Sequence, residues 1–219
     1  ASTDQIPESV ISEMRELGLF GLTIPEEYGG QGLNTEEECK VAIELGYTSA
    51  AFRSVIGTNN GIGSQGLVMD GTDDQKENYL PRLASGEIIG SFALTEPNVG
   101  SDSANVQTKA EKDGDSYILN GTKRWITNAN IANLFTVFAR TDQSQKGSSG
   151  VSAFLVDANT PGISLSSKYK KMGQQGAHVC DVIFDNCQVP EVNIIGGPNN
   201  VNNGFKTAMK TLDRGRIHI

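Results

Sequence analysis

The spacing of apolar residues along the chain changes once, near Ile88, and this change constrains the fold more than any other feature of the sequence. Before it, apolar residues recur at helical intervals, as in the stripe Val10, Ile11, Met14 and Leu17. After it, apolar and polar residues alternate with a period of two between clusters of turn residues, which is typical of short strands. The sequence therefore predicts an α+β fold with helices and strands segregated along the chain.

This pattern divides the chain into three segments. We expect a helical N-terminal domain at residues 1–87, an antiparallel β-sandwich or barrel as the middle domain at residues 88–197, and the beginning of a C-terminal helical domain at residues 198–219. In the third segment the apolar helical stripe of Phe205 and Met209 continues without a glycine or proline stop signal. We therefore expect the natural protein to continue beyond it, so that most of the third domain is absent here.

Local signals mark the ends of several elements. Asn34 and Glu37 have the spacing of a capping box at the start of a helix. The dipeptides Asp113-Gly114 and Asn120-Gly121 favour β-hairpin turns, because their residues accept positive φ angles.

Composition disfavours several classes of function. The 219 residues carry 18 basic and 26 acidic side chains, and the net charge of −8 argues against a broad cationic surface for nucleic acid or anionic lipid. No apolar run approaches the roughly 20 residues that cross a bilayer. Three scattered cysteines argue against a disulfide framework and for a reducing compartment. We expect neither nucleic-acid nor membrane partners.

Two patterns occur without the context that would give them chemical meaning. Gly61 to Gly66 matches G-x-G-x-x-G, but the preceding residues 50–60 have helical spacing instead of the spacing of a buried strand. Close helix packing through small residues fits that context better than dinucleotide binding. His178, His218 and the cysteines show no recognised metal-ligand spacing, so we expect no metal site.

The segment from Phe92 to Ala104 is the strongest candidate for a binding site. It has the pattern of a strand that runs into a loop containing glycine, proline and several hydroxyl side chains. Such a loop can present backbone N–H groups and hydroxyl oxygens to a phosphate or to the polar edge of a planar ligand, and Gly100 permits close approach. A plain strand exit with an Asx or Ser turn is the commoner meaning of this pattern alone.

The only tryptophan of the chain, Trp125, lies two residues before Thr127 in an expected strand. Alternation along a strand points both side chains to the same face. That face can offer an aromatic wall and a hydroxyl donor to a planar heterocycle. A single tryptophan on a strand more often belongs to the core, so this segment is informative only in combination with the preceding one.

Several motifs, in this order, resemble those of the acyl-CoA dehydrogenase family. The strongest are Ala93-Leu-Thr-Glu-Pro-Asn-Val-Gly-Ser-Asp102, Trp125-Ile-Thr-Asn128 and Leu212-Asp-Arg-Gly-Arg216, which occur at the family's spacings. The segments 25–33 and 71–81 are similar to further landmarks of the family. The likeness spans essentially the whole chain and implies the same order of three domains that the periodicity predicts.

The resemblance implies FAD as the cofactor, with one segment around the pyrimidine and pyrophosphate side of the flavin and a second segment over one face of the ring. By position in the motifs, Thr95 is the implied partner of a flavin carbonyl edge, Thr127 the partner of N5, and Trp125 the aromatic wall. The implied cofactor-binding residues are Phe92, Ala93, Leu94, Thr95, Glu96, Pro97, Asn98, Val99, Gly100, Ser101, Trp125, Ile126 and Thr127.

The resemblance also implies an acyl-CoA substrate. The family removes the α-proton of an acyl-CoA thioester while the β-hydrogen leaves as hydride to the flavin, which gives a trans-2-enoyl-CoA, and the electrons pass to an electron-transfer flavoprotein. The implied substrate-binding residues are Ser101, Asp213, Arg214, Gly215 and Arg216.

The catalytic base is the main departure from the family pattern. Most members carry this glutamate deep in the C-terminal domain, and a minority carry it at the place of Gly215. Glycine cannot act as a base, so the resemblance implies that the base lies outside these 219 residues and that they are inactive alone. Family flavin sites also use residues of a neighbouring subunit. We therefore expect a homotetramer or homodimer at full length, and weak or absent FAD binding by these residues alone.

Two alternative functions are an acyl-CoA oxidase, in which oxygen reaches the reduced flavin, and a non-catalytic relative that acts as a binding or scaffold module. The negative net charge counts against a nucleic-acid-binding module. Bacterial cytoplasm and mitochondrial matrix are both expected compartments. Gln175 and Ala177 stand where many relatives have arginine and a hydroxyl residue, so the sequence does not indicate which acyl group is preferred.

Overall fold

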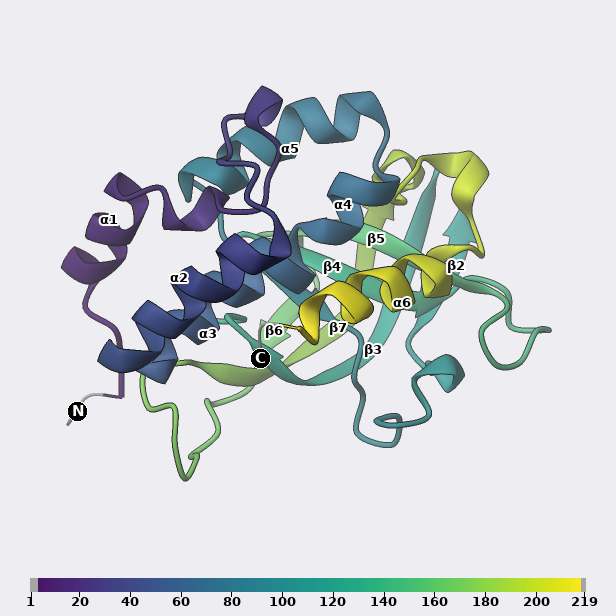
Figure 1. Cartoon of the computed structure of the whole chain (residues 1–219). Helices are drawn as coiled ribbons and strands as arrows, with labels where there is room; N and C mark the ends of the chain where they lie inside the picture. The colour runs from purple at the N-terminus through teal and green to yellow at the C-terminus, as the bar shows by residue number, and fades with distance from the viewer. Residues whose placement is uncertain (1–3, 218–219) are drawn as a thin grey trace.

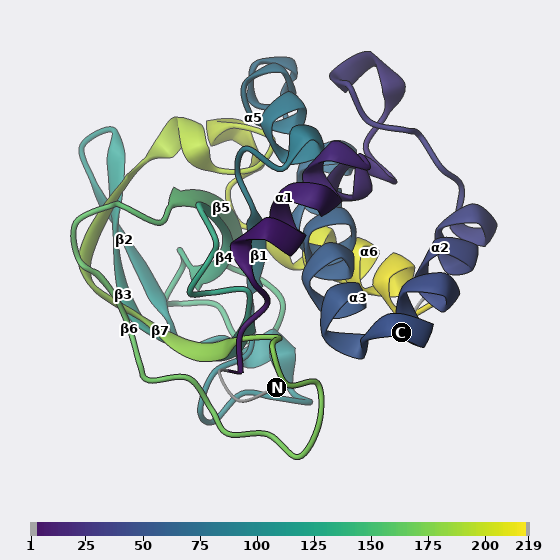
Figure 2. The same ribbon diagram turned by 90° about the vertical axis from the view of Figure 1, so that its left-hand side faces the viewer.

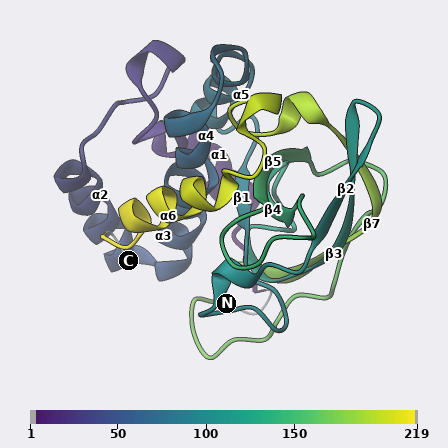
Figure 3. The same cartoon turned by 90° about the vertical axis from the view of Figure 1, so that its right-hand side faces the viewer.

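The computed structural model describes residues 4–217; residues 1–3 and 218–219, which include His218 and the outer ends of the expected first and third segments, lie outside the described residues. Figure 1 shows helices packed along one side of a curled sheet. The turned views in Figures 2 and 3 show the same two parts, with helix α6 (Gly204–Gly215) between them. The expected α+β fold, with a helical part, a sheet and the start of another helical part, is confirmed.

Two of the helices before the sheet begin at capping boxes. The Asn34 side chain accepts hydrogen bonds from the backbone of Glu36 and Glu37, and the Glu37 carboxylate accepts one from the Asn34 backbone. Thr72 and Gln75 form a second capping box. The α-helices described before the sheet are α1 (Glu8–Glu16), α2 (Thr35–Thr48), α3 (Ala50–Gly57), α4 (Gln65–Asp70) and α5 (Asp73–Ser85).

The glycine-rich segment 61–66 is helical, as expected from its context. A π-helix, η3 (Thr58–Gly63), joins α3 to α4. A Cβ atom at Gly63 would lie 2.7 Å from the carbonyl oxygen of Thr58 and 3.0 Å from the carbonyl carbon of Gly90. Glycine therefore lets the helical part approach the first strand of the sheet, and close packing explains the motif.

The strands of the described chain form one sheet with the order β1-β4-β2-β3-β7-β6, and β5 pairs with β4 outside that path. They are β1 (Gly90–Ala93), β2 (Lys109–Asp113), β3 (Ser116–Thr127), β4 (Leu134–Arg140), β5 (Val151–Asp157), β6 (Ile163–Leu165) and β7 (Val179–Pro190). Most pairs are antiparallel, as expected, but β1 and β2 each run parallel to β4. The parallel pairs arise because the chain returns to the sheet in the same direction after a crossover connection.

One of the two predicted hairpin turns is wrong. Asp113-Gly114 makes the expected turn between β2 and β3, with a φ angle of 59° at Gly114. At Asn120-Gly121, by contrast, β3 continues, and its register relative to β7 shifts between Leu119 and Gly121. A Cβ atom at Gly121 would lie 2.6 Å from Oγ1 of Thr108. Glycine is thus needed here for close approach to a neighbouring strand, and no turn results.

The described residues form three hydrophobic core clusters, of which one lies among the N-terminal helices around Phe20 and Ile56 and two include strands of the sheet. Of the latter two, one lies within the curled sheet and includes Phe135 and Phe154. The other lies between the sheet and the helices, and it joins Phe92 at β1, Phe138 of β4 and Ala208 of α6. The rings of Phe92 and Phe138 lie 4.9 Å apart, between their centroids. This second core fixes the end of β1 beside α6, and the candidate site lies at that junction.

Candidate functional site

An open cavity of about 330 Å³ lies where the end of β1, the end of β3, the π-helix η3 and the last turns of α6 meet. This volume is within the usual range of small-molecule sites. The cavity is lined by Thr58, Ile62, Phe92, Leu94, Thr95, Gly100, Ser101, Ser103, Trp125, Ile126, Thr127, Leu212 and Arg216.

The two segments that the sequence singles out therefore converge on one cavity, although they are separated along the chain. The predicted site residues that line it are Phe92, Leu94, Thr95, Gly100, Ser101, Trp125, Ile126, Thr127 and Arg216. The predicted site residues outside this lining are Ala93, Glu96, Pro97, Asn98, Val99, Asp213, Arg214 and Gly215. Sequence reasoning missed four lining residues: Thr58, Ile62, Ser103 and Leu212. Leu212 and Ser103 belong to segments already noted, and Ile62 lies within the glycine pattern 61–66, which the sequence analysis attributed to helix packing, whereas no motif includes Thr58.

Glu96 points away from the cavity and into the protein. Its carboxylate accepts hydrogen bonds from Nζ of Lys123 at 2.7 Å, from the backbone of Gln107 at 2.7 Å, and from the backbone and hydroxyl of Thr108 at 2.9 and 2.6 Å. Nζ of Lys123 also donates to the carbonyl oxygen of Leu94 at 3.2 Å. Glu96 and Lys123 thereby tie the bend after β1 to strand β3.

The side chains of this ion pair are almost completely buried, at 0% exposure for Lys123 and 3% for Glu96. Burial lowers the pKa of Lys123 to about 8, although the charge and hydrogen bond of Glu96 act in the opposite direction. Burial raises the pKa of Glu96, but the charge of Lys123 and the hydrogen bonds outweigh it, and the pKa lies below its usual value. The pair therefore stabilises the fold only while both partners are present.

Trp125 lies at a bulge in β3 and is 60% exposed. Its φ angle is 57°, a left-handed conformation that a bulky residue rarely adopts. Simple strand alternation, from which we expected Trp125 and Thr127 on one face, is therefore interrupted between them. Both residues nevertheless line the cavity, because the bulge re-aims the indole. The backbone N–H of Arg124 donates to the carbonyl oxygen of Thr95 at 2.8 Å and joins the two segments directly.

The last turns of α6 close another side of the cavity with Leu212 and Arg216. The guanidinium of Arg216 forms an ion pair with Asp213 at 2.6 Å. Gly215 is buried against Ile62, and a Cβ atom there would lie 3.0 Å from its Cγ2. The first side-chain atom of any other residue at position 215 would thus contact Ile62, which lines the cavity.

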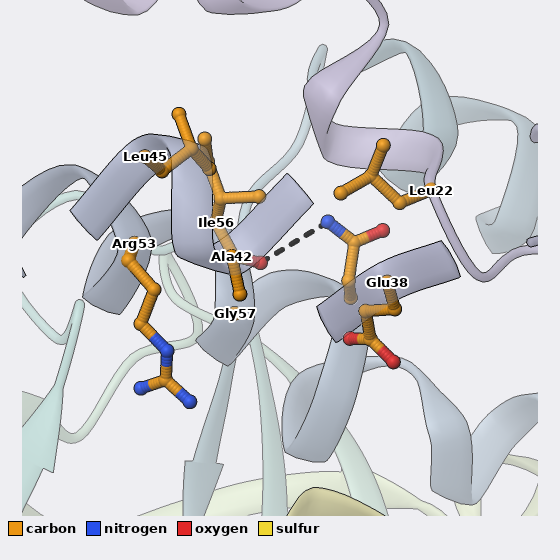
Figure 4. A pocket seen from close by; sticks show the side chains of 8 residues that line it. Leu22, Glu38, Ala42, Leu45, Arg53, Ile56 and Gly57 are labelled. Atoms are coloured by element: carbon orange, nitrogen blue, oxygen red, sulfur yellow. Dashed lines mark hydrogen bonds between the residues drawn. The ribbon is translucent and has the colours of Figure 1, made fainter. Parts of the chain in front are cut away.

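A second hollow, between α2 and the region where α3 meets η3, does not have the size of a ligand site. Figure 4 shows Glu38 and Arg53 among the residues that line it, together with Leu22 and Ile56. Its volume of about 10 Å³ is close to that of a single water site. Burial raises the pKa of Glu38, and the charges of Arg214 and Arg53 partly offset this effect; burial lowers the pKa of Arg53, and the charge of Glu38 partly offsets it. This hollow accommodates interacting charged side chains.

The side chains that line the cavity of about 330 Å³ indicate which kind of ligand it can bind. It combines an exposed indole, five hydroxyl side chains and one guanidinium, and no carboxylate of residues 4–217 lines it. An indole beside hydroxyl donors fits a flat heterocycle with polar edges. The lining includes no side chain that would act as a strong general base. Among the described residues, no group of three His, Cys, Asp or Glu side chains is placed to hold a metal ion.

Comparison with known proteins shows the family. The model of the acyl-CoA dehydrogenase N-terminal domain matches residues 1–87, and that of the middle domain matches residues 91–187. An acyl-CoA dehydrogenase of Bacillus subtilis is 40% identical over 217 residues, which cover 99% of this chain and 56% of the relative. The mitochondrial isovaleryl-CoA dehydrogenase of Pongo abelii is 42% identical, with coverage of 94% and 48%. This chain belongs to the acyl-CoA dehydrogenase family.

A solved structure supports the same relationship. An acyl-CoA dehydrogenase of Bacillus anthracis, complexed with FAD, superimposes with a TM-score of 0.86 at 37% identity and covers 95% of this chain and 35% of that one. No helix within residues 4–217 is both long and apolar enough to span a membrane. The chain spans about half the length of the curated relatives that it matches.

Proposed function

We propose that this chain supplies the flavin site and part of the acyl-CoA site of an FAD-dependent acyl-CoA dehydrogenase. The observation that carries the proposal is the convergence of the bend 95–101 and the bulge at Trp125 on one open cavity. Family membership and the FAD complex of the Bacillus anthracis relative support it. The exposed indole supports it independently, because a large aromatic side chain next to an open cavity offers a surface for stacking.

Each lining residue has a role in this proposal. Trp125 would cover one face of a bound flavin ring, and the hydroxyl groups of Thr95 and Thr127 would donate hydrogen bonds to its polar edge. Ser101 would contact both cofactor and substrate, and Arg216 would offer a positive charge to the acyl-CoA. When bound, FAD would supply the hydride acceptor of the reaction.

The α-proton of the substrate needs a separate acceptor. Because no carboxylate of the described residues lines the cavity, we assign the base to a position outside this lining. Gly215, the one position in α6 where the resemblance implies an alternative base, has no side chain. These 219 residues alone are therefore proposed to bind ligands without dehydrogenating them.

The remaining properties of the whole protein follow the family. We propose that an electron-transfer flavoprotein accepts the electrons, that the whole protein is a homotetramer or homodimer, and that it works in bacterial cytoplasm or mitochondrial matrix. Both bacterial and mitochondrial relatives support these compartments.

Titration of the chain with FAD should quench the emission of Trp125, the only tryptophan, in a saturable way. We expect a Kd on the order of 10 μM, since a site that lacks contacts from other parts of the protein binds weakly. ADP, which lacks the flavin ring, should not quench. A linear decrease identical to that of N-acetyltryptophanamide would contradict the proposed site.

Anaerobic addition of butyryl-CoA or isovaleryl-CoA to the FAD-loaded chain should not bleach the visible flavin absorbance. Loss of a general base lowers a rate by about 10²–10⁴-fold, so bleaching within minutes would contradict the assignment of the base. Bleaching that reverses rapidly in air would support the alternative of an acyl-CoA oxidase. Free FAD with the same thioesters is the control.

A further inference from the structure

The bulge that carries Trp125 faces a single residue of the neighbouring strand. In the pairing of β3 with β7, Lys123 lies opposite Val182 and Ile126 lies opposite Cys180. Arg124 and Trp125 therefore both face Asp181, which is the two-against-one arrangement of a β-bulge. A bulky residue keeps a left-handed φ angle only where its surroundings hold it there.

The carboxylate of Asp181 contacts both residues of the bulge. It accepts hydrogen bonds from the backbone N–H of Trp125 at 3.4 Å and from Nε and Nη2 of Arg124 at 3.3 and 3.2 Å. The hydroxyl of Tyr169 also donates to it, at 3.1 Å. Asp181 is only 7% exposed, so its charge depends on these donors in place of water.

A second contact joins the bulge to the bend after β1. The backbone N–H of Arg124 donates to the carbonyl oxygen of Thr95 at 2.8 Å. That contact uses backbone atoms alone, and a substitution at either residue preserves it. Asp181 is therefore the side chain through which the sequence holds the conformation of the bulge.

We propose that Asp181 is a positioning residue that fixes the indole of Trp125 against the cavity. The proposal rests on the proposed function of Trp125 as the wall of the flavin site. Tyr169 extends the arrangement to the segment 166–178, because its backbone N–H donates to the carbonyl oxygen of Val179 at 2.9 Å. The order of that segment and the orientation of the indole are thus coupled through one carboxylate.

The test compares Asp181→Asn with Asp185→Asn in the complete chain. Asp185 lies on the same strand but is exposed, and its carboxylate accepts a hydrogen bond from its neighbour Asn186, so the two variants change the net charge equally. In Asp181→Asn we expect a lower fluorescence anisotropy of Trp125 without ligand and a Kd for FAD that rises about fivefold. Asp181→Glu, which keeps the carboxylate, should recover most of the anisotropy. Asp185→Asn should match the unmodified chain.

Equal anisotropy and equal FAD affinity in the two asparagine variants would overturn the proposal. Tyr169→Phe is the second variant, for the case in which Asp181→Asn does not fold. It removes one hydrogen-bond donor to the carboxylate of Asp181, and Tyr169 is only half-buried. Unchanged anisotropy of Trp125 in Tyr169→Phe would also overturn the proposal. The anisotropy of the ligand-free chain reports positioning even where FAD does not bind. Failure of the flavin site and failure of the positioning role are therefore distinguishable.

Discussion

Replacing Lys123 with methionine should lower the free energy of unfolding by about 3–5 kcal/mol, because the substitution leaves the carboxylate of Glu96 buried without its cationic partner. Thermal or urea denaturation measures the loss. Methionine is similar in length to lysine and fills the same space, so the change tests charge and hydrogen bonding more than packing. The carbonyl oxygen of Leu94 also loses its donor, which adds to the effect.

Two controls sharpen this result. Lys112→Met removes the ion pair between Lys112 and Glu191, whose side chains are 47% and 29% exposed, and it should lower the stability by no more than about 1 kcal/mol. A double variant with Glu96→Gln should be about 2 kcal/mol more stable than the sum of the two single changes predicts, since both charges are then absent. Equal losses in Lys123→Met and Lys112→Met would show that burial does not govern this pair.

Replacing Trp125 with alanine should weaken FAD binding roughly thirtyfold, because the ring loses both a stacking partner and the apolar area that it covers. Isothermal titration calorimetry measures the Kd without the fluorescence of the missing indole. The indole is 60% exposed, so the stability of the fold should change little. Trp125→Phe should retain part of the affinity because a smaller aromatic face remains.

Cys39→Ala is the matched control for this prediction. Cys39 is partly exposed on α2 and lines a different surface hollow, whose lining does not include Trp125. This variant should bind FAD like the unmodified chain. If Trp125→Ala also retained its affinity, the indole would not be the wall of the flavin site, and a different face of the cavity would have to hold the ring.

Much of the fold could be predicted from local sequence. The capping boxes at Asn34 and Thr72 satisfy backbone groups within one turn, so a short segment contains all the information that they need. The hairpin at Asp113-Gly114 is local in the same sense. The hairpin turn predicted at Asn120-Gly121 was wrong because glycine is also used where two segments approach closely. The segment that approaches Gly121 contains Thr108, which lies far from it along the chain.

The candidate site was likewise predictable where short segments carry the information and not where distant residues make contact. The segments 92–101 and 125–127 could be singled out from their residues and from the family resemblance, and their role in flavin binding stays a prediction. The inward direction of Glu96 could not be foreseen, because its partners Thr108 and Lys123 are 12 and 27 residues away along the chain. No motif pointed to Thr58, and the glycine pattern around Ile62 indicated helix packing instead of a ligand site, since only the packing of η3 against β1 brings these residues to the cavity.

The sequence by itself determined the order of helices and strands, the ends of several elements and the family, because periodicity, caps and motifs are read within a few residues of one another. Only the tertiary structure decided which residues of those motifs face the cavity and which support them from within. The physical reason is that the direction of a side chain depends on strand register, and the register of β3 is shifted by a bulge that Asp181 and Thr95 hold from two other segments. Such contacts form between residues that are distant along the chain, so they are fixed only when the sheet and the helices pack together.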